Sequence, residues 1–243
     1  MSETKLVKFL QTARKPLAGT QQLTPAILSD SKGSYLRDQV VNKSDRNIIW
    51  WCKGGATIDD RYHWLKSNIV KKIEQLGNIS VYIFLGTCNL TSKNKTGEIT
   101  LTSQQEHFTD EIISKLGQFV TLFKKYPSSK LTILEIPVYS ITEWNRYKGH
   151  KNPETFKDQD SQLQKQIENI NEWIHTTNQE LGSRSPLLNH HLRARKQQAR
   201  GKHKPCKKYY NVKLYKDGIH PKQLLAKAWL AEIVEQVHKD CWA

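Results

Sequence analysis

The segment 217–221 places Asp217 three residues before His220. An aspartate beside a histidine can fix the tautomer of the imidazole and stabilise the imidazolium that forms during proton transfer. A short apolar stretch precedes the pair at 210–214, and an amphipathic pattern with helical spacing follows it at 224–237. This order predicts a strand, a tight turn and a helix, with both side chains in one turn at the carboxyl end of a strand. The pair can move a proton, but it needs a nucleophile.

A serine in an earlier turn is the candidate nucleophile. The apolar run 23–28 stops at the small and polar residues 29–33, and Tyr35 and Leu36 then indicate the start of a helix. A turn between a strand and a helix presents a side chain at the edge of a sheet, and here that side chain belongs to Ser31. Turns and helix caps favour the same residue types, so a purely structural role for Ser31 is the alternative.

Two further strand ends carry groups that could bind an oxyanion. The apolar run 48–52 leads into a glycine pair that includes Gly55, and glycine allows backbone N–H groups to come close to a ligand. The run 81–85 leads into Cys88 and Asn89. Each residue also has a structural interpretation: Gly55 in a strand-to-helix turn, Asn89 in a loop and Cys88 as a small apolar side chain.

Strand-like runs alternate with helical patterns along the whole chain. Helical spacing is clear at 59–76, 104–126 and 159–181, while 131–138 and 210–214 are the fourth and fifth strand-like runs. This alternation predicts a three-layer α/β/α fold, with a mostly parallel five-stranded sheet and right-handed crossovers. The turns described above would then meet at one edge of the sheet.

In their order and spacing, these turns resemble the four sequence blocks of the SGNH, or GDSL-like, hydrolase family. The resemblance extends over about 25–235 and rests on the segments Ser29-Asp30-Ser31, Gly55-Ala56-Thr57, Gly86-Thr87-Cys88-Asn89 and Asp217-Gly218-Ile219-His220. It implies the flavodoxin-like SGNH fold and a serine esterase that hydrolyses a small acetyl or short acyl ester. No metal or organic cofactor is implied.

The resemblance also implies a role for each site residue. Ser31 would be the nucleophile, His220 the general base and Asp217 the group that orients His220. The backbone N–H groups of Ser31 and Gly55 would donate to the oxyanion, together with the side-chain amide of an asparagine from the third block.

Two positions depart from the family pattern. Ser29 stands where the first block usually begins with glycine. The third block usually reads Gly-x-Asn-Asp, so strict alignment places Cys88 at the oxyanion asparagine and Asn89 at the aspartate. A thiol is a poor donor, and the loss of one oxyanion donor lowers turnover by about 100- to 1,000-fold. Three outcomes stay open: Asn89 donates from a shifted loop, the enzyme is slow, or the site no longer catalyses.

The formal charge of +15 would attract polyanions or anionic membranes. The segment 183–208 contains many Lys and Arg residues and no acidic residue, which predicts either a solvated insertion or a surface for RNA or DNA phosphates. The candidate contacts are Arg193, Arg195, Lys196, Arg200, Lys202 and Lys204. The alternative function is therefore nucleic-acid binding on a catalytically weak SGNH scaffold. Such a combination resembles the esterase domains in the first open reading frame of certain non-LTR retrotransposons.

The remaining features concern organisation and location. We expect a basic N-terminal arm at 1–20 and one hydrolase domain at 21–243, with the basic insertion inside it. The loop 139–156 is rich in aromatic and basic residues and could be a lid or a base-stacking surface.

We predict no metal site, because the histidines near 190 and 203 do not have a common zinc spacing. The lack of a signal-like segment and of C-x-x-C pairs predicts an intracellular protein, cytoplasmic or nuclear. An anionic membrane is a further possible partner, and the oligomeric state is not indicated.

Overall fold

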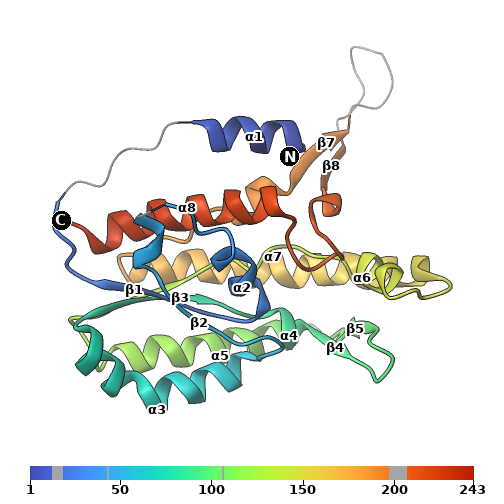
Figure 1. The fold of residues 1–243 in the computed structure, drawn as a ribbon. Helices are drawn as coiled ribbons and strands as arrows, with labels where there is room; N and C mark the ends of the chain where they lie inside the picture. The colour runs from blue at the N-terminus through green and yellow to red at the C-terminus, as the bar shows by residue number, and fades with distance from the viewer. Residues whose placement is uncertain (13–18, 43, 106, 197–206) are drawn as a thin grey trace.

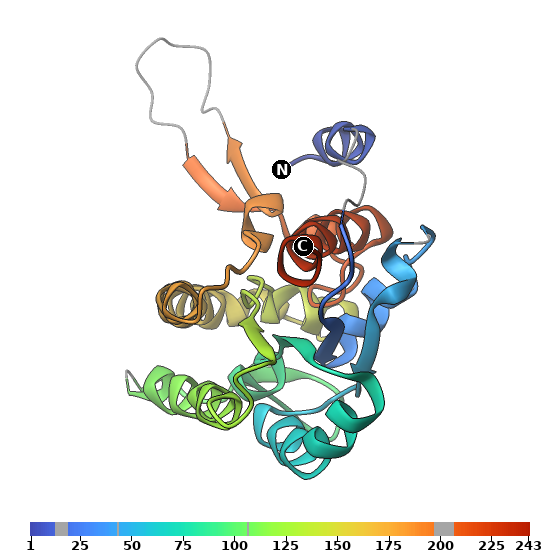
Figure 2. The same ribbon diagram turned by 90° about the vertical axis from the view of Figure 1, so that its left-hand side faces the viewer.

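A parallel sheet between two layers of helices forms the centre of the molecule (Figure 1). The computed structural model describes residues 1–12, 19–42, 44–105, 107–196 and 207–243. The central sheet has the strand order β2-β1-β3-β6, and all neighbouring strands are parallel. Helices α3 and α5 cover one face, and α7 and α8 cover the other (Figures 1 and 2). The expected three-layer α/β/α fold is confirmed.

The helices are α1 (Glu3–Gln11), α2 (Ser31–Arg37), α3 (Ile58–Leu76), α4 (Thr87–Leu90), α5 (Phe108–Phe123), α6 (Ile141–Tyr147), α7 (Lys157–Glu180) and α8 (Gln223–Cys241). The central strands are β1 (Thr24–Ser29), β2 (Ile49–Cys52), β3 (Ile79–Phe84) and β6 (Lys130–Ile133). Two antiparallel hairpins are formed by β4 (Thr91–Lys93) with β5 (Ile99–Leu101) and by β7 (Arg193–Lys196) with β8 (Lys207–Tyr210). Short 3-10 turns are η1 (Ser44–Asn47), η2 (Pro153–Phe156), η3 (Leu188–His191) and η4 (Val212–Leu214).

Local sequence explains the central elements. All six residues of β3 are buried, as expected for a strand that has helices on both faces. Helix α3 begins with a capping box in which Thr57 and Asp60 bind each other's backbone N–H groups. It ends at Gly77, whose positive φ of 74° suits glycine.

The predicted fifth strand is absent from the central sheet in the described ranges, so the five-stranded prediction is wrong. Tyr210 belongs to the β7–β8 hairpin instead, and 212–214 forms η4. The predicted fourth strand is also shorter than expected, because β6 ends at Ile133. Side chains that bind the backbone along the outer edge of β6 explain both differences.

Asparagine side chains occupy that edge. Asn178 and Asn171, both on α7, accept hydrogen bonds from the backbone N–H groups of Ile133 (2.9 Å) and Ile136 (2.8 Å) and donate to the carbonyl groups of the same residues. Asn189 accepts from the N–H of Val138 at 2.8 Å and donates to the carbonyl of Ile136. These amides take the bonds that a fifth strand would make.

Other segments also differ from expectation. Residues 3–11 of the predicted arm form α1, which packs against α8 and buries Leu6 completely. The division near residue 20 into an arm and a hydrolase domain stays a prediction. The loop 139–156 contains α6 and η2, and the polar stretch before Thr102 forms β4 and β5. Within the described ranges, no helix is both long and apolar enough to cross a membrane.

Candidate active site

Ser31, His220 and Asp217 form a continuous chain of hydrogen bonds. Ser31 Oγ lies 3.0 Å from His220 Nε2, and His220 Nδ1 lies 2.7 Å from Asp217 Oδ2. An ionised carboxylate only accepts hydrogen bonds, so Nδ1–H donates to Asp217 and Nε2 is left to accept from the Ser31 hydroxyl. This is the tautomer that a general base for Ser31 requires.

The segment from Asp217 to His220 is held by backbone contacts rather than by a strand, contrary to the prediction. Asp217 Oδ1 accepts from the N–H groups of Ile219 (3.0 Å) and His220 (2.8 Å). Gly218 has a φ of +94°, and a Cβ at this position would lie 2.7 Å from the backbone nitrogen of Trp144. The N–H of Ser140, the residue before α6, donates to the Gly218 carbonyl at 3.0 Å. The turn is thus fixed against the start of α6.

The environment of Asp217 favours its ionised form. Burial acts to raise the pKa of this carboxyl, but hydrogen bonds from the His220 side chain and from the N–H groups of His220 and Ile219 outweigh burial and leave the pKa below its ordinary value. The carboxylate therefore stays charged at neutral pH, as the orientation of His220 requires.

A pH-dependent stability difference follows. Because the folded-state pKa of Asp217 is lowered, its charged form stabilises the folded chain above the unfolded pKa of about 4, and that stability is lost as the pH falls through the folded pKa. We expect the gap in unfolding free energy between the wild type and Asp217→Asn to shrink from about pH 6 to about pH 3 in urea titrations. Asp110→Asn, at an exposed carboxylate on α5, is the control. If the difference in unfolding free energy between the wild type and Asp217→Asn does not change with pH, the pKa of Asp217 is not lowered in the folded chain.

Two aromatic rings that the sequence analysis missed pack on the imidazole of His220. The ring of Tyr35 stacks on it at a centroid distance of 4.7 Å and an angle of 22°, and the ring of Trp144 lies 5.9 Å away. Tyr35 is four residues after Ser31 on α2, so the helical i,i+4 spacing was an available signal. The two rings restrict the motion of the imidazole beside Ser31.

The predicted oxyanion residues have different surroundings. Asn89 Oδ1 accepts from the N–H of Ile58 at 2.9 Å, so its carbonyl end is committed to the start of α3. Cys88 is half-buried, and burial raises the pKa of its thiol, which keeps it protonated. Gly55 has a φ of +73°, and no atom would lie within 4 Å of an added Cβ, so the approach to this turn is open.

Comparison with solved structures gives matches over almost the whole chain. A GDSL-like lipase from Bacteroides thetaiotaomicron has a TM-score of 0.60, with 14% identity and 98% of each chain covered. A protein from Bacteroides fragilis, named as an acylhydrolase, has a TM-score of 0.59 and 14% identity, with 98% of this chain and 94% of that chain covered. The chain has the SGNH hydrolase fold. No protein-family model matches the sequence, and no curated protein matches it.

Lys32 is an unusual feature of this SGNH fold that the sequence analysis did not single out. It follows Ser31 directly, its exposed fraction is 2%, and its ammonium lies 3.4 Å from Asp30 Oδ2. The ammonium also donates to Thr87 Oγ1 and lies over the rings of Phe84 and Tyr139 at 5.9 and 5.8 Å. The buried ion pair lies within the serine turn, and the hydrogen bond from Lys32 to Thr87 joins this turn to α4, which carries Cys88 and Asn89.

Removal of the ammonium should destabilise the fold. Lys32→Met keeps the length of the side chain but leaves the buried Asp30 carboxylate without its cation, which costs about 3–5 kcal/mol. Urea denaturation at neutral pH measures this cost. Lys71→Met, at an exposed position on α3, should stay within about 0.5 kcal/mol of the wild type. Equal losses in the two variants would show that the buried pair does not contribute as expected.

The basic residues predicted to bind nucleic acid are only partly described. Arg193, Arg195 and Lys196 belong to β7, whereas Arg200, Lys202 and Lys204 lie outside the described residues. In the part of the chain that the structure describes, no group of three or more His, Cys, Asp or Glu side chains could hold a metal ion.

Proposed function

We propose that the protein is a serine esterase that hydrolyses an acetyl or short acyl ester. The observation that carries this proposal is the chain of hydrogen bonds from Ser31 through His220 to Asp217, with distances of 3.0 and 2.7 Å. The fold supports it, because the solved structures of similar fold include a GDSL-like lipase and a protein named as an acylhydrolase.

The reaction has two steps with His220 in two roles. Ser31 Oγ attacks the ester carbonyl while Nε2 of His220 accepts the serine proton, and the tetrahedral intermediate collapses as the alcohol leaves with that proton. Water then attacks the acyl-enzyme, with His220 again as the base, and releases the acid and free Ser31. Asp217 stabilises the imidazolium in both steps.

Oxyanion stabilisation is the weakest part of this proposed site. The backbone N–H groups of Ser31 and Gly55 are the proposed donors, as the resemblance implies. The amide oxygen of Asn89 binds the N–H of Ile58, and the position that aligns with the oxyanion asparagine holds Cys88. With a weak thiol donor in the third place, we propose an esterase with low turnover.

The test is hydrolysis of p-nitrophenyl acetate by the wild type and by Ser31→Ala, together with labelling by a fluorophosphonate probe. A label on Ser31 in the wild type requires an activated serine, and the absence of labelling would favour a scaffold without catalysis. An intracellular location, and an origin in a mobile element, remain predictions from the sequence.

A further inference from the structure

A groove of about 1400 Å³ lies beside the β7–β8 hairpin, apart from the Ser31 site. The hairpin stands out from the helical layers (Figure 2). The far side of the groove is formed by α6 and the first half of α7, and Lys5 of α1 also contributes to its lining. No described residue of the groove belongs to the proposed triad, so the groove is a separate surface.

The strand register places positive charges opposite one another along this hairpin. Arg195 pairs with Lys208, and Arg193 pairs with Tyr210. Residues directly opposite on antiparallel strands point to the same face, and like charges there are destabilising. A two-stranded hairpin is also marginally stable by itself. An anion bound between Arg195 and Lys208 would relieve this repulsion.

The acidic residues of the groove already have partners, which themselves line the groove. Glu143 forms an ion pair with Arg146. Asp160 accepts from the Ser140 hydroxyl at 2.7 Å and from backbone N–H groups at the start of α6. Glu168 accepts from the Tyr210 hydroxyl at 3.1 Å.

Several cations of the groove have no carboxylate partner among the residues that the structure describes. Across the described ranges, no carboxylate forms an ion pair with Lys5, Arg195 or Lys208. Together with the formal net charge of +15, this makes the groove a surface for a polyanion.

The side chains between the cations indicate the kind of polyanion. Tyr210 lines the groove and is partly buried. It pairs with Arg193, so it lies on the same face of the hairpin as Arg195 and Lys208, whereas Tyr209 points to the other face. Spaced cations that contact phosphates, interleaved with aromatic rings that stack on bases, are the pattern of single-strand binding proteins. An anionic membrane would favour exposed aliphatic side chains, and the described side chains of β7 and β8 include none larger than Ala194.

We infer that the groove between the β7–β8 hairpin and helices α6 and α7 binds single-stranded nucleic acid, with Arg195 and Lys208 on phosphates and Tyr210 stacked on a base. This site does not depend on the proposed esterase activity. Binding is governed by phosphate charge and base stacking, so it is tolerant of sequence and sensitive to salt.

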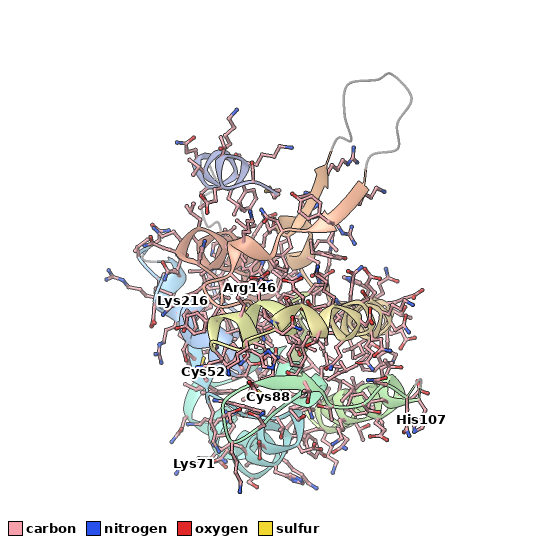
Figure 3. The ribbon with its side chains drawn as sticks, turned by 90° about the vertical axis from the view of Figure 1, so that its right-hand side faces the viewer. Cys52, Lys71, Cys88, His107, Arg146 and Lys216 are labelled. Carbon is pink, nitrogen blue, oxygen red and sulfur yellow. The ribbon has the colours of Figure 1, made fainter. Side chains whose placement is uncertain are left out.

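The test uses the full chain and a fluorescein-labelled oligouridine of about 15 nucleotides, measured by fluorescence anisotropy across a series of KCl concentrations. Arg195→Gln/Lys208→Gln should weaken binding about 10-fold and reduce the slope of log K against log salt by about 1.4, because each phosphate contact on a single strand contributes about 0.7. Lys71→Gln/Lys124→Gln removes the same amount of charge from exposed positions on α3 (Lys71, labelled in Figure 3) and at the end of α5 (Lys124), and it should leave the slope unchanged. Equal losses in the two double variants would overturn the assignment to this groove.

A second pair of variants separates base stacking from charge. Tyr210→Phe and Tyr210→Ala both remove the hydroxyl bond to Glu168, so the difference between them reports on the ring alone. Tyr210→Ala should bind oligouridine about 5- to 100-fold more weakly than Tyr210→Phe. Heparin supplies charge without bases, and its affinity should be the same for both variants. Equal oligouridine affinities for the Phe and Ala variants would overturn the nucleic-acid assignment, as would sedimentation with phosphatidylserine vesicles by a protein that does not bind oligouridine.

Discussion

Ser31→Ala is expected to lower kcat for p-nitrophenyl acetate by a factor of about 10,000 to 1,000,000, since the nucleophile, the base and the orienting carboxylate act as one unit. The rate acceleration that Ser31→Ala retains over the uncatalysed reaction would come from substrate binding and from the oxyanion donors. The substitution removes only the hydroxyl at the first position of α2, where Asp30 still caps the helix by accepting from the Lys32 N–H at 2.8 Å. The fold should therefore be retained.

Ser34→Ala is the matched control, because Ser34 lies on the same short helix, one turn away from the site. It should keep the wild-type rate and the fluorophosphonate label. Ser31→Ala should lose both while its affinity for oligouridine is unchanged. Full hydrolysis by Ser31→Ala would end the proposal of a serine esterase and leave the nucleic-acid inference intact.

The second large effect that we expect is an increase in kcat. Cys88→Asn should raise kcat for p-nitrophenyl acetate by about 100-fold, because an amide donor at this place would complete the oxyanion hole of an SGNH fold. The Asn89 side chain is held at the start of α3, where its Oδ1 accepts from the Ile58 N–H at 2.9 Å. The half-buried thiol of Cys88 has a raised pKa, so it remains protonated, and it is a weak donor.

Cys88→Ala distinguishes a new donor from a change in packing. It removes the thiol without adding an amide, so its rate should stay close to that of the wild type. If Cys88→Asn is no faster than Cys88→Ala, position 88 does not contact the oxyanion. The stability of both variants is checked by urea denaturation, since Cys88 is half-buried.

The sequence predicts β1, β2 and β3 well because each is a short apolar run that ends at small or polar residues. The same pattern places Ser31 correctly at the carboxyl end of β1, but Asp217 and His220 reach it from a turn held against the start of α6 and not from the end of a fifth strand. The order of the turns was informative because parallel strands place successive turns at one edge of a sheet. Catalysis by these residues stays a prediction until it is measured.

The features that the sequence could not predict depend on contacts between residues that are far apart in the chain. The burial of Lys32 depends on Asp30, Thr87 and two rings, and a lysine in a turn looks like a surface residue when taken alone. The bond from Asn89 to Ile58 joins residues 31 positions apart. Residues 3–11 were expected to belong to a basic arm, yet α1 buries Leu6 against α8.

The asparagine side chains along the β6 edge have a consequence for behaviour at high concentration. An open sheet edge is a template on which another molecule can add a strand, and such addition begins aggregation and fibril growth. Here an incoming chain would have to displace Asn171, Asn178 and Asn189 from backbone groups that they already bind. Because two of these amides come from one long helix, the edge is closed to self-association only while α7 is docked on the sheet.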